Sequence, residues 1–99
     1  MCNLSKKELL IASHIIPWRY SSSYQKLDVL NGLLLCPNHD SLFDKGYISF
    51  EDNGKVIISN EISINDANIS NVNSNMGISV LEGQQKYLSW HRNNILRKF

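Results

Sequence analysis

The chain has 99 residues, 42% of them hydrophobic, and its 10 basic and 9 acidic side chains leave a net charge of +1. A chain of this length makes one small domain, which buries only about 60–65% of its unfolded surface and therefore has a thin stability margin. The hydrophobic fraction excludes general disorder, and the near-neutral charge excludes a polycationic tail protein.

Membrane and secretion signals are not recognisable in the sequence. The longest apolar runs, at 9–12 and 33–36, fall far short of the roughly 20 residues that span a bilayer. The first residues do not resemble a signal peptide. The two cysteines, Cys2 and Cys36, are too few for a disulfide framework. We therefore expect a protein without a membrane partner, in a reducing cytoplasm.

The chain begins with the pattern of a strand followed by a loop. The apolar run at 9–13 predicts a short buried strand that ends near His14. Pro17 follows, and the residue before a proline is pushed towards extended geometry. The polar stretch 18–31 predicts a long loop with a helical turn at 24–29.

A second strand and a short helix come next. The Asn-Gly pair at 31–32 predicts a turn into an apolar strand at 33–36. A helix is expected over 38–45, because Pro37 suits a first helical turn and Gly46 suits the position after a last one.

The rest of the chain predicts a hairpin, a loop and a helix. The two β-rich runs within 47–59 flank Asn-Gly at 53–54, which is the strongest short-range hairpin signal. Residues 60–78 are rich in asparagine and read as loop, with an edge strand left open at 62–64. Apolar side chains at helical spacing predict a C-terminal helix over about 84–97. The expected class is α+β.

Three blocks of residues carry the chemistry: Ser13 to Pro17, Asn31 to Cys36, and Asn38 to Gly46. Their order and spacing resemble the HNH endonuclease family, in the branch that forms the C-terminal part of many restriction-type nucleases. The resemblance covers about 2–59. It implies a ββα-metal (His-Me finger) core, to which the hairpin and the C-terminal helix are added. One HNH nuclease domain is expected over 1–99, with its core at about 9–46, the hairpin at 47–59, the loop at 60–78 and the helix at 84–97.

The resemblance assigns roles to several residues. His14 matches the general base, and Asn31 the middle asparagine that ties the loop and orients the base. The family's ligand for one divalent cation falls on Asp40 by spacing, with His39 one position earlier. Helix neighbours point about 100° apart, so we do not expect both to hold one ion. Asp40 suits Mg²⁺, the expected ion, whereas His39 suits Mn²⁺ or another transition metal.

Two further positions bear on the metal. Ser13 stands where many relatives carry an acidic residue, so it is at most a weak ligand. Asp44, one helical turn after Asp40, either braces the loop or the cation or is a solvated carboxylate. Cys36 is interpreted as a buried strand residue and Cys2 stays unassigned, so a structural zinc is not expected.

Contacts to DNA are expected from Trp18 and Arg19, and weakly from Arg92. For Trp18 a role as a core anchor is favoured over base stacking. We thus expect a metal-dependent DNA endonuclease of a restriction or defence system, acting alone, as a homodimer or with a separate recognition domain. The alternative is a catalytically weak nucleic-acid-binding module, which Ser13 favours. A small zinc-stabilised interaction domain is a third reading with little support.

Overall fold

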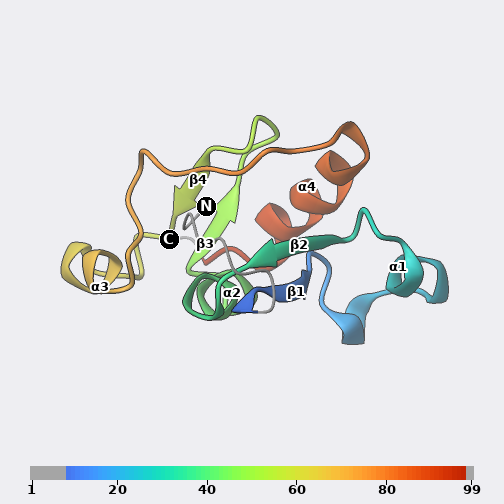
Figure 1. Cartoon of the computed structure of the whole chain (residues 1–99), viewed down its shortest axis with the longest axis horizontal. Helices are drawn as coiled ribbons and strands as arrows, with labels where there is room; N and C mark the ends of the chain where they lie inside the picture. The colour runs from blue at the N-terminus through green and yellow to red at the C-terminus, as the bar shows by residue number, and fades with distance from the viewer. Residues whose placement is uncertain (1–8, 98–99) are drawn as a thin grey trace.

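Two small antiparallel sheets organise residues 9–97, the part of the chain that this computed structural model describes (Figure 1). The first sheet pairs β1 (Ile11–His14) with β2 (Gly32–Leu35), so that His14 lies opposite Gly32. The second pairs β3 (Ile48–Phe50) with β4 (Val56–Ile58). The predicted mixture of helices and small sheets is confirmed. Cys2 lies outside the described residues.

The first strand is less buried than its apolar sequence predicts. Ile11 is 41% exposed, Ala12 is also exposed, and Ser13 is the buried residue of the strand. The strand ends at His14 as predicted, but the expectation of a buried strand is wrong for Ile11 and Ala12. Side chains alternate across a strand, so Ala12 points away from the face that carries Ser13 and the buried partners Leu33 and Leu35. Ile11 shares the face of Ser13, but it is the first residue of the strand and lies at the end of the sheet.

The segment between the two strands contains more regular structure than a loop. A 3₁₀ turn, η2 (Trp18–Tyr20), precedes the helix α1 (Ser23–Leu27). A capping box starts α1: the Ser22 hydroxyl accepts from the amide of Gln25, whose side chain accepts from the amide of Ser22. The predicted helical turn is present, one residue earlier than expected.

The helix α2 (Pro37–Asp44) packs against β1 and β2. It starts after Cys36, which is buried as expected but precedes the helix instead of belonging to the strand. Pro37 occupies the first turn, where its missing N–H is not needed. Gly46 follows the helix with φ of 79°, a left-handed conformation that favours glycine. Both predicted end signals are confirmed.

The hairpin β3–β4 forms where Asn-Gly predicts it. The amide of Gly54 donates to the carbonyl of Glu51 at 2.8 Å, and Gly54 has φ of 89°. The amide of Glu51 donates in turn to the carbonyl of Lys55 at 2.9 Å. These bonds fix the turn that sets the register of the two strands.

The asparagine-rich segment contains a helix, α3 (Ile64–Ile69), in place of the edge strand left open there. The hydroxyl of Ser63 accepts from the amide of Asp66 at 3.0 Å and so caps the first turn. The spacing of Ile62 and Ile64 is misleading because the side chain of Ile64 is 82% exposed and does not report a buried strand face.

The helix α4 (Gln85–Asn94) follows a 3₁₀ turn, η3 (Glu82–Gln84), and packs on β3. It begins where the sequence predicts and ends three residues before the predicted end at 97. The buried apolar side chains of α4 belong to a single hydrophobic core that also contains side chains from both sheets. The buried residues of this core are Ile15, Ile16, Leu33, Leu35, Phe43, Ile48, Phe50, Val56, Val72, Tyr87 and Leu88. Within residues 9–97, none of the helices combines the length and the apolar character needed to cross a bilayer.

Candidate active site

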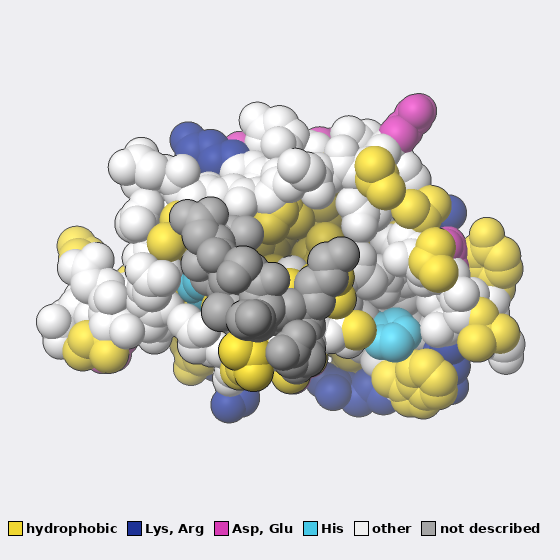
Figure 2. Space-filling view, in the orientation of Figure 1, with side chains coloured by type: hydrophobic (Ala, Val, Ile, Leu, Met, Phe, Trp, Pro, Cys, Tyr) yellow, Lys and Arg dark blue, Asp and Glu magenta, His cyan; other side chains and the backbone are white. Residues whose placement is uncertain are grey.

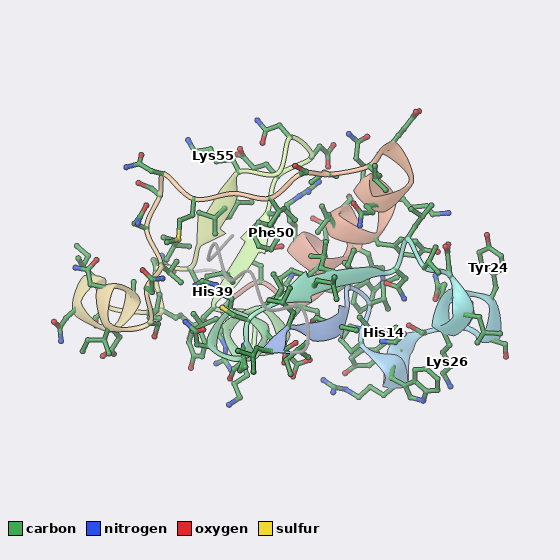
Figure 3. The ribbon with its side chains drawn as sticks, viewed as in Figure 1. His14, Tyr24, Lys26, His39, Phe50 and Lys55 are labelled. Carbon is green, nitrogen blue, oxygen red and sulfur yellow. The ribbon has the colours of Figure 1, made fainter. Side chains whose placement is uncertain are left out.

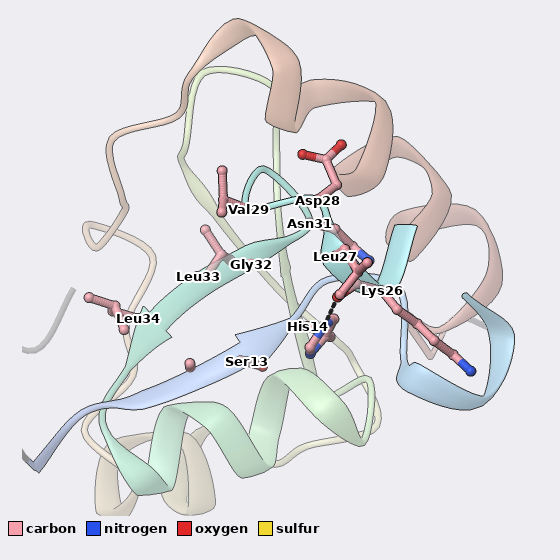
Figure 4. Close-up of a pocket in the computed structure, with 11 residues that line it drawn as sticks. Ser13, His14, Lys26, Leu27, Asp28, Val29, Asn31, Gly32, Leu33 and Leu34 are labelled. Atoms are coloured by element: carbon pink, nitrogen blue, oxygen red, sulfur yellow. Dashed lines mark hydrogen bonds between the residues drawn. The ribbon is translucent and has the colours of Figure 1, made fainter. Parts of the chain in front are cut away.

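His14 ends β1 with its imidazole half-buried beside the segment that carries α1 (Figure 4). Its Nε2 atom lies 3.2 Å from the carbonyl oxygen of Lys26. A carbonyl oxygen only accepts hydrogen bonds, so Nε2 carries a proton, and in the neutral ring the lone pair is then on Nδ1. Nδ1 has no hydrogen-bond partner among the described residues. The ring is therefore held in the tautomer that a base requires.

Trp18 lies edge to face against His14, with ring centroids 5.4 Å apart and an angle of 86° between the planes. The ammonium of Lys26 lies 4.7 Å from the centre of the same indole. Trp18 is 56% exposed, so the favoured interpretation as a core anchor is wrong. The indole covers the imidazole from outside, because the short turn after Pro17 places it on the surface.

Asn31 is fully buried below this segment and connects three points of it. Its Oδ1 accepts from the amide of Ile16 at 2.8 Å. Its Nδ2 donates to the carbonyl of Gln25 at 3.1 Å and to the hydroxyl of Ser21 at 3.3 Å. Since Gln25 precedes Lys26, the asparagine holds the backbone whose carbonyl meets His14. An amide can do this because it both donates and accepts.

A cleft of about 480 Å³ opens between the end of β1, η2 and α2. Its walls include His14 and, from α2, the carboxylates of Asp40 and Asp44. Residues four apart on a helix share a face, so both carboxylates lie on the same side of α2. Ser13, Trp18 and Arg19 complete the cleft together with Ala12 and Pro17. The cleft thus joins an imidazole base, two carboxylates and a guanidinium.

His39 lies away from this cleft, although it neighbours Asp40 in sequence. Its ring is fully buried, with Nε2 3.0 Å from the carbonyl oxygen of Asn71 and Nδ1 3.0 Å from Sγ of Cys36. Both ring nitrogens are thus engaged in the interior. Adjacent helix residues point about 100° apart, and of the two only Asp40 lines the cleft with His14.

Arg92 also lies elsewhere. Its guanidinium donates to the carbonyl of Phe50 at 2.8 Å and to the carboxylate of Asp52 at 2.9 Å. The structure therefore brings together five of the predicted site residues and a sixth from below. Asn31 supports the cleft, while His39 and Arg92 lie apart from it. Five predicted site residues line the cleft: Ser13, His14, Trp18, Arg19 and Asp40.

Lys26 contributes to the candidate site in a way that the sequence does not reveal. Its contribution to His14 is a backbone carbonyl, which every residue possesses, so no residue type could signal it. The signal that existed was indirect: the Ser22 and Gln25 spacing of a capping box predicts a helix start, and so the turn that presents this carbonyl.

The donors in the cleft are compatible with a hard divalent cation. Residues 9–97 contain no group of three or more His, Cys, Asp or Glu side chains that could enclose a metal by themselves. Mg²⁺ does not need such a cage, because it keeps several waters and takes one or two carboxylates plus substrate phosphates. Asp40 and Asp44, on one face of α2, offer that donor set.

An imidazole base above a cleft with carboxylates is typical of a hydrolytic site. A family model described as HNH endonuclease matches residues 1–51, more than half of the chain and the part that supplies every residue of the cleft. The chain belongs to the HNH endonuclease family. A nuclease-type activity is the general function that this membership indicates. No protein with curated annotation matches the chain.

Proposed function

We propose that this protein is a metal-dependent DNA endonuclease in which His14 activates water for the hydrolysis of a phosphodiester bond. The observation that carries the proposal is the state of His14. Its Nε2 proton is engaged by the carbonyl of Lys26, its Nδ1 is unengaged by the described residues, and Asp40 lines the same cleft. Binding alone would not require an imidazole held in this way.

The reaction follows from the two ring nitrogens. Nδ1 accepts a proton from a water molecule while the water oxygen forms a bond to phosphorus. The bond from phosphorus to the 3′ oxygen breaks, and that oxygen leaves and takes a proton from solvent. Positive charge develops on the imidazole during the first step, and the hydrogen bond from Nε2 to the Lys26 carbonyl is then strengthened by that charge.

Side chains around the cleft orient the strand. Arg19 is exposed at its rim and can donate to phosphate oxygens from a planar guanidinium. Asp40, with Asp44 one turn later, would hold the cation, for which Mg²⁺ is our first choice and Mn²⁺ the second. When bound, the ion supplies positive charge that stabilises the phosphate and the leaving oxygen. Ser13 is buried and neutral, and contributes at most one weak oxygen ligand.

The cellular setting belongs to the same proposal. A net charge of +1 gives little sequence-independent attraction to DNA. We therefore infer that tight binding depends on a second copy or a separate recognition domain. A role in a restriction or defence system in the cytoplasm suits a nuclease of this family.

Nicking of supercoiled plasmid tests the proposal. Wild type, His14→Ala and a surface control, Lys55→Ala on the hairpin, are compared with Mg²⁺, with Mn²⁺ and with EDTA. Loss of a general base costs about 10²- to 10⁴-fold in rate, so His14→Ala should lose nicking while the control keeps it. Circular dichroism checks that all three proteins are folded. Equal nicking by wild type and His14→Ala contradicts the role of His14. Metal-independent DNA binding without nicking by either protein instead supports the nucleic-acid-binding alternative.

A further inference from the structure

Exposed apolar side chains gather beside His14. Five of the eleven large apolar side chains that are exposed in residues 9–97 lie within residues 18–29. We call these five the apolar collar: Trp18, Tyr20, Tyr24, Leu27 and Val29. In Figure 3, Tyr24 and Lys26 lie at the same end of the molecule as His14. In Figure 2, apolar side chains lie next to the histidine on that end, with basic side chains below it.

The part of the collar that projects furthest is held in place by hydrogen bonds. Leu27 is 83% exposed and Val29 is 88% exposed, on either side of Asp28. The carboxylate of Asp28 accepts from the hydroxyl of Tyr87 at 2.5 Å and from the amide of Leu30 at 3.0 Å. The two apolar side chains are therefore presented on an ordered backbone, which lowers the entropic cost of binding to them.

The collar and His14 share a second pocket. A cavity of about 340 Å³ is lined by His14, Lys26, Leu27, Val29 and Leu34, among others (Figure 4). A ligand in this cavity would therefore touch both His14 and the collar. The collar is thus continuous with the candidate active site and is not an isolated surface patch.

Cations are interleaved with the collar. Arg19 lies between Trp18 and Tyr20, and Lys26 directly precedes Leu27. Neither forms an ion pair within the described residues, where the only such pair joins Arg92 to Asp52. Each cation also packs on a ring of the collar: the guanidinium of Arg19 lies 4.8 Å from the centre of the Tyr20 ring, and the ammonium of Lys26 lies 4.7 Å from that of Trp18. Apolar and aromatic side chains interleaved with cations that lie outside any ion pair within residues 9–97 suit a ligand whose faces are apolar and whose backbone is anionic.

A nucleic-acid strand with unpaired bases has this chemistry. Single strands bind where aromatic and apolar side chains receive the base faces and cations follow the phosphates. In a paired duplex the base faces are stacked on each other and cannot reach such side chains. We propose that the substrate class is DNA with unpaired bases, either single-stranded or opened, whose bases lie on the collar while a phosphate lies at His14. This inference rests on the proposed function, because it takes the strand at His14 to be DNA.

Binding without metal tests the proposal separately from catalysis. Fluorescence anisotropy in EDTA compares a labelled oligothymidine with a paired duplex of the same length and at the same salt concentration. Single strands should bind about tenfold more tightly. Removing one stacking side chain costs about 1–3 kcal/mol, which is a factor of about 5 to 150. Tyr24→Ala should therefore weaken single-strand binding at least about fivefold.

A matched pair of variants separates the collar from apolar surface in general. Leu27→Ser with Val29→Ser changes the collar, whereas Ile64→Ser with Ile69→Ser changes α3, where the two side chains are 82% and 75% exposed. Figure 1 shows α1 and α3 at opposite ends of the molecule. The first variant should weaken single-strand binding about tenfold or more, and the second should leave it unchanged.

Each outcome of these experiments either supports or overturns the inference. Equal affinity for single strands and duplex, or equal binding by the two double variants, overturns the inference. So does sedimentation showing that the collar variant only converts a dimer to a monomer without any change in DNA binding. If plasmid nicking fails while the single-strand preference depends on the collar, the proposed function falls and the binding site stands. If nicking succeeds, wild type should cut an unpaired bubble at least about tenfold faster than the same sequence paired, by the same stacking argument.

Discussion

His91 lies face to face with Phe43, with ring centroids 3.8 Å apart and the planes 1° from parallel. Its Nε2 donates to the carbonyl of Phe43 at 2.8 Å, so its Nδ1 accepts from the hydroxyl of Ser49, 2.7 Å away. The pKa of His91 is lowered to about 4, chiefly by burial; the hydrogen bond to the Phe43 carbonyl opposes this shift and the nearby charge of Arg92 adds to it. The folded protein therefore keeps this imidazole neutral in its core.

This burial predicts a loss of stability in mild acid. In the unfolded chain His91 binds a proton near pH 6.5, whereas in the folded protein it does so only near pH 4. The unfolded state thus holds more protons between these values, and the free energy of unfolding falls as pH falls through that window. At 1.36 kcal/mol per pKa unit, the full loss is on the order of 3 kcal/mol. Urea unfolding across the window measures it.

The control is His91→Gln, which removes the titrating group. It should be less stable than wild type at neutral pH but should show a flatter dependence between the two values. An unchanged slope in His91→Gln would contradict the assignment.

Asn31→Ala should destabilise the fold and slow nicking. The change leaves the buried amide of Ile16 without its hydrogen-bond partner. It also removes one of two donors from the half-buried carbonyl of Gln25, which keeps the amide of Asp28 at 3.4 Å. Each buried group left unpaired costs about 1–3 kcal/mol. Nicking should also slow beyond the effect of unfolding, because the Lys26 carbonyl that meets His14 loses its support. The urea midpoint and the nicking rate of the folded fraction measure the two effects.

Asn53→Ala is the control, since Asn53 accepts from the amide of Lys55 in an exposed turn. Surface substitutions of this kind usually change stability by less than about 0.5–1 kcal/mol. Similar losses of stability in the two variants would show that the buried hydrogen bonds of Asn31 stabilise the fold no more than the exposed hydrogen bond of Asn53 does.

Asp40→Asn should reduce metal-dependent nicking at least about tenfold, because it removes a charged oxygen ligand for a hard cation. The deficit should shrink as the Mg²⁺ concentration rises. Asp66→Asn is a matched control, because Asp66 also lies in the first turn of a helix and the effect on the helix dipole is the same. Wild-type nicking by Asp40→Asn at low Mg²⁺ would remove Asp40 from the site. Asp44→Asn then tests the second carboxylate.

Gly46→Ala should destabilise the chain more than Gly32→Ala. Gly46 has φ of 79°, and a Cβ there would lie 2.1 Å from the carbonyl oxygen of Ile95. The left-handed backbone alone costs a non-glycine residue about 1–2 kcal/mol, and the collision adds to it. A Cβ at Gly32 would meet nothing closer than 3.5 Å. The difference in urea midpoint measures the effect, and equal midpoints would contradict it.

Elements whose ends are marked by proline, glycine or an Asn-Gly pair could be predicted from the sequence. Pro37 and Gly46 delimit α2, and the Asn-Gly pair at 53–54 places the hairpin turn, because these signals act on their own backbone. The helix α3 was missed because its start depends on one capping hydroxyl, at Ser63, in a segment whose composition resembles a loop. The exposed Ile64 added a false strand pattern.

The candidate site could be predicted in part. The spacing of His14 and Asp40 predicts residues that the fold places in one cleft. Sequence alone does not say which of two helix neighbours faces the cleft, since His39 and Asp40 differ only by a rotation about the axis of α2. The exposure of Trp18 depends on how the turn after Pro17 leaves the sheet, which is a tertiary property.

The packing of α4 crosses the boundary of the matched family segment, and this limits how the protein can be engineered. Tyr87 fixes Asp28, and His91 packs on Phe43, although both helix residues lie beyond residue 51. We therefore do not expect the matched segment to keep its structure when it is transferred without α4. A chimera that exchanged residues 1–51 alone would carry the candidate catalytic side chains but would leave behind the helix α4, whose Tyr87 binds Asp28 in the segment beside them.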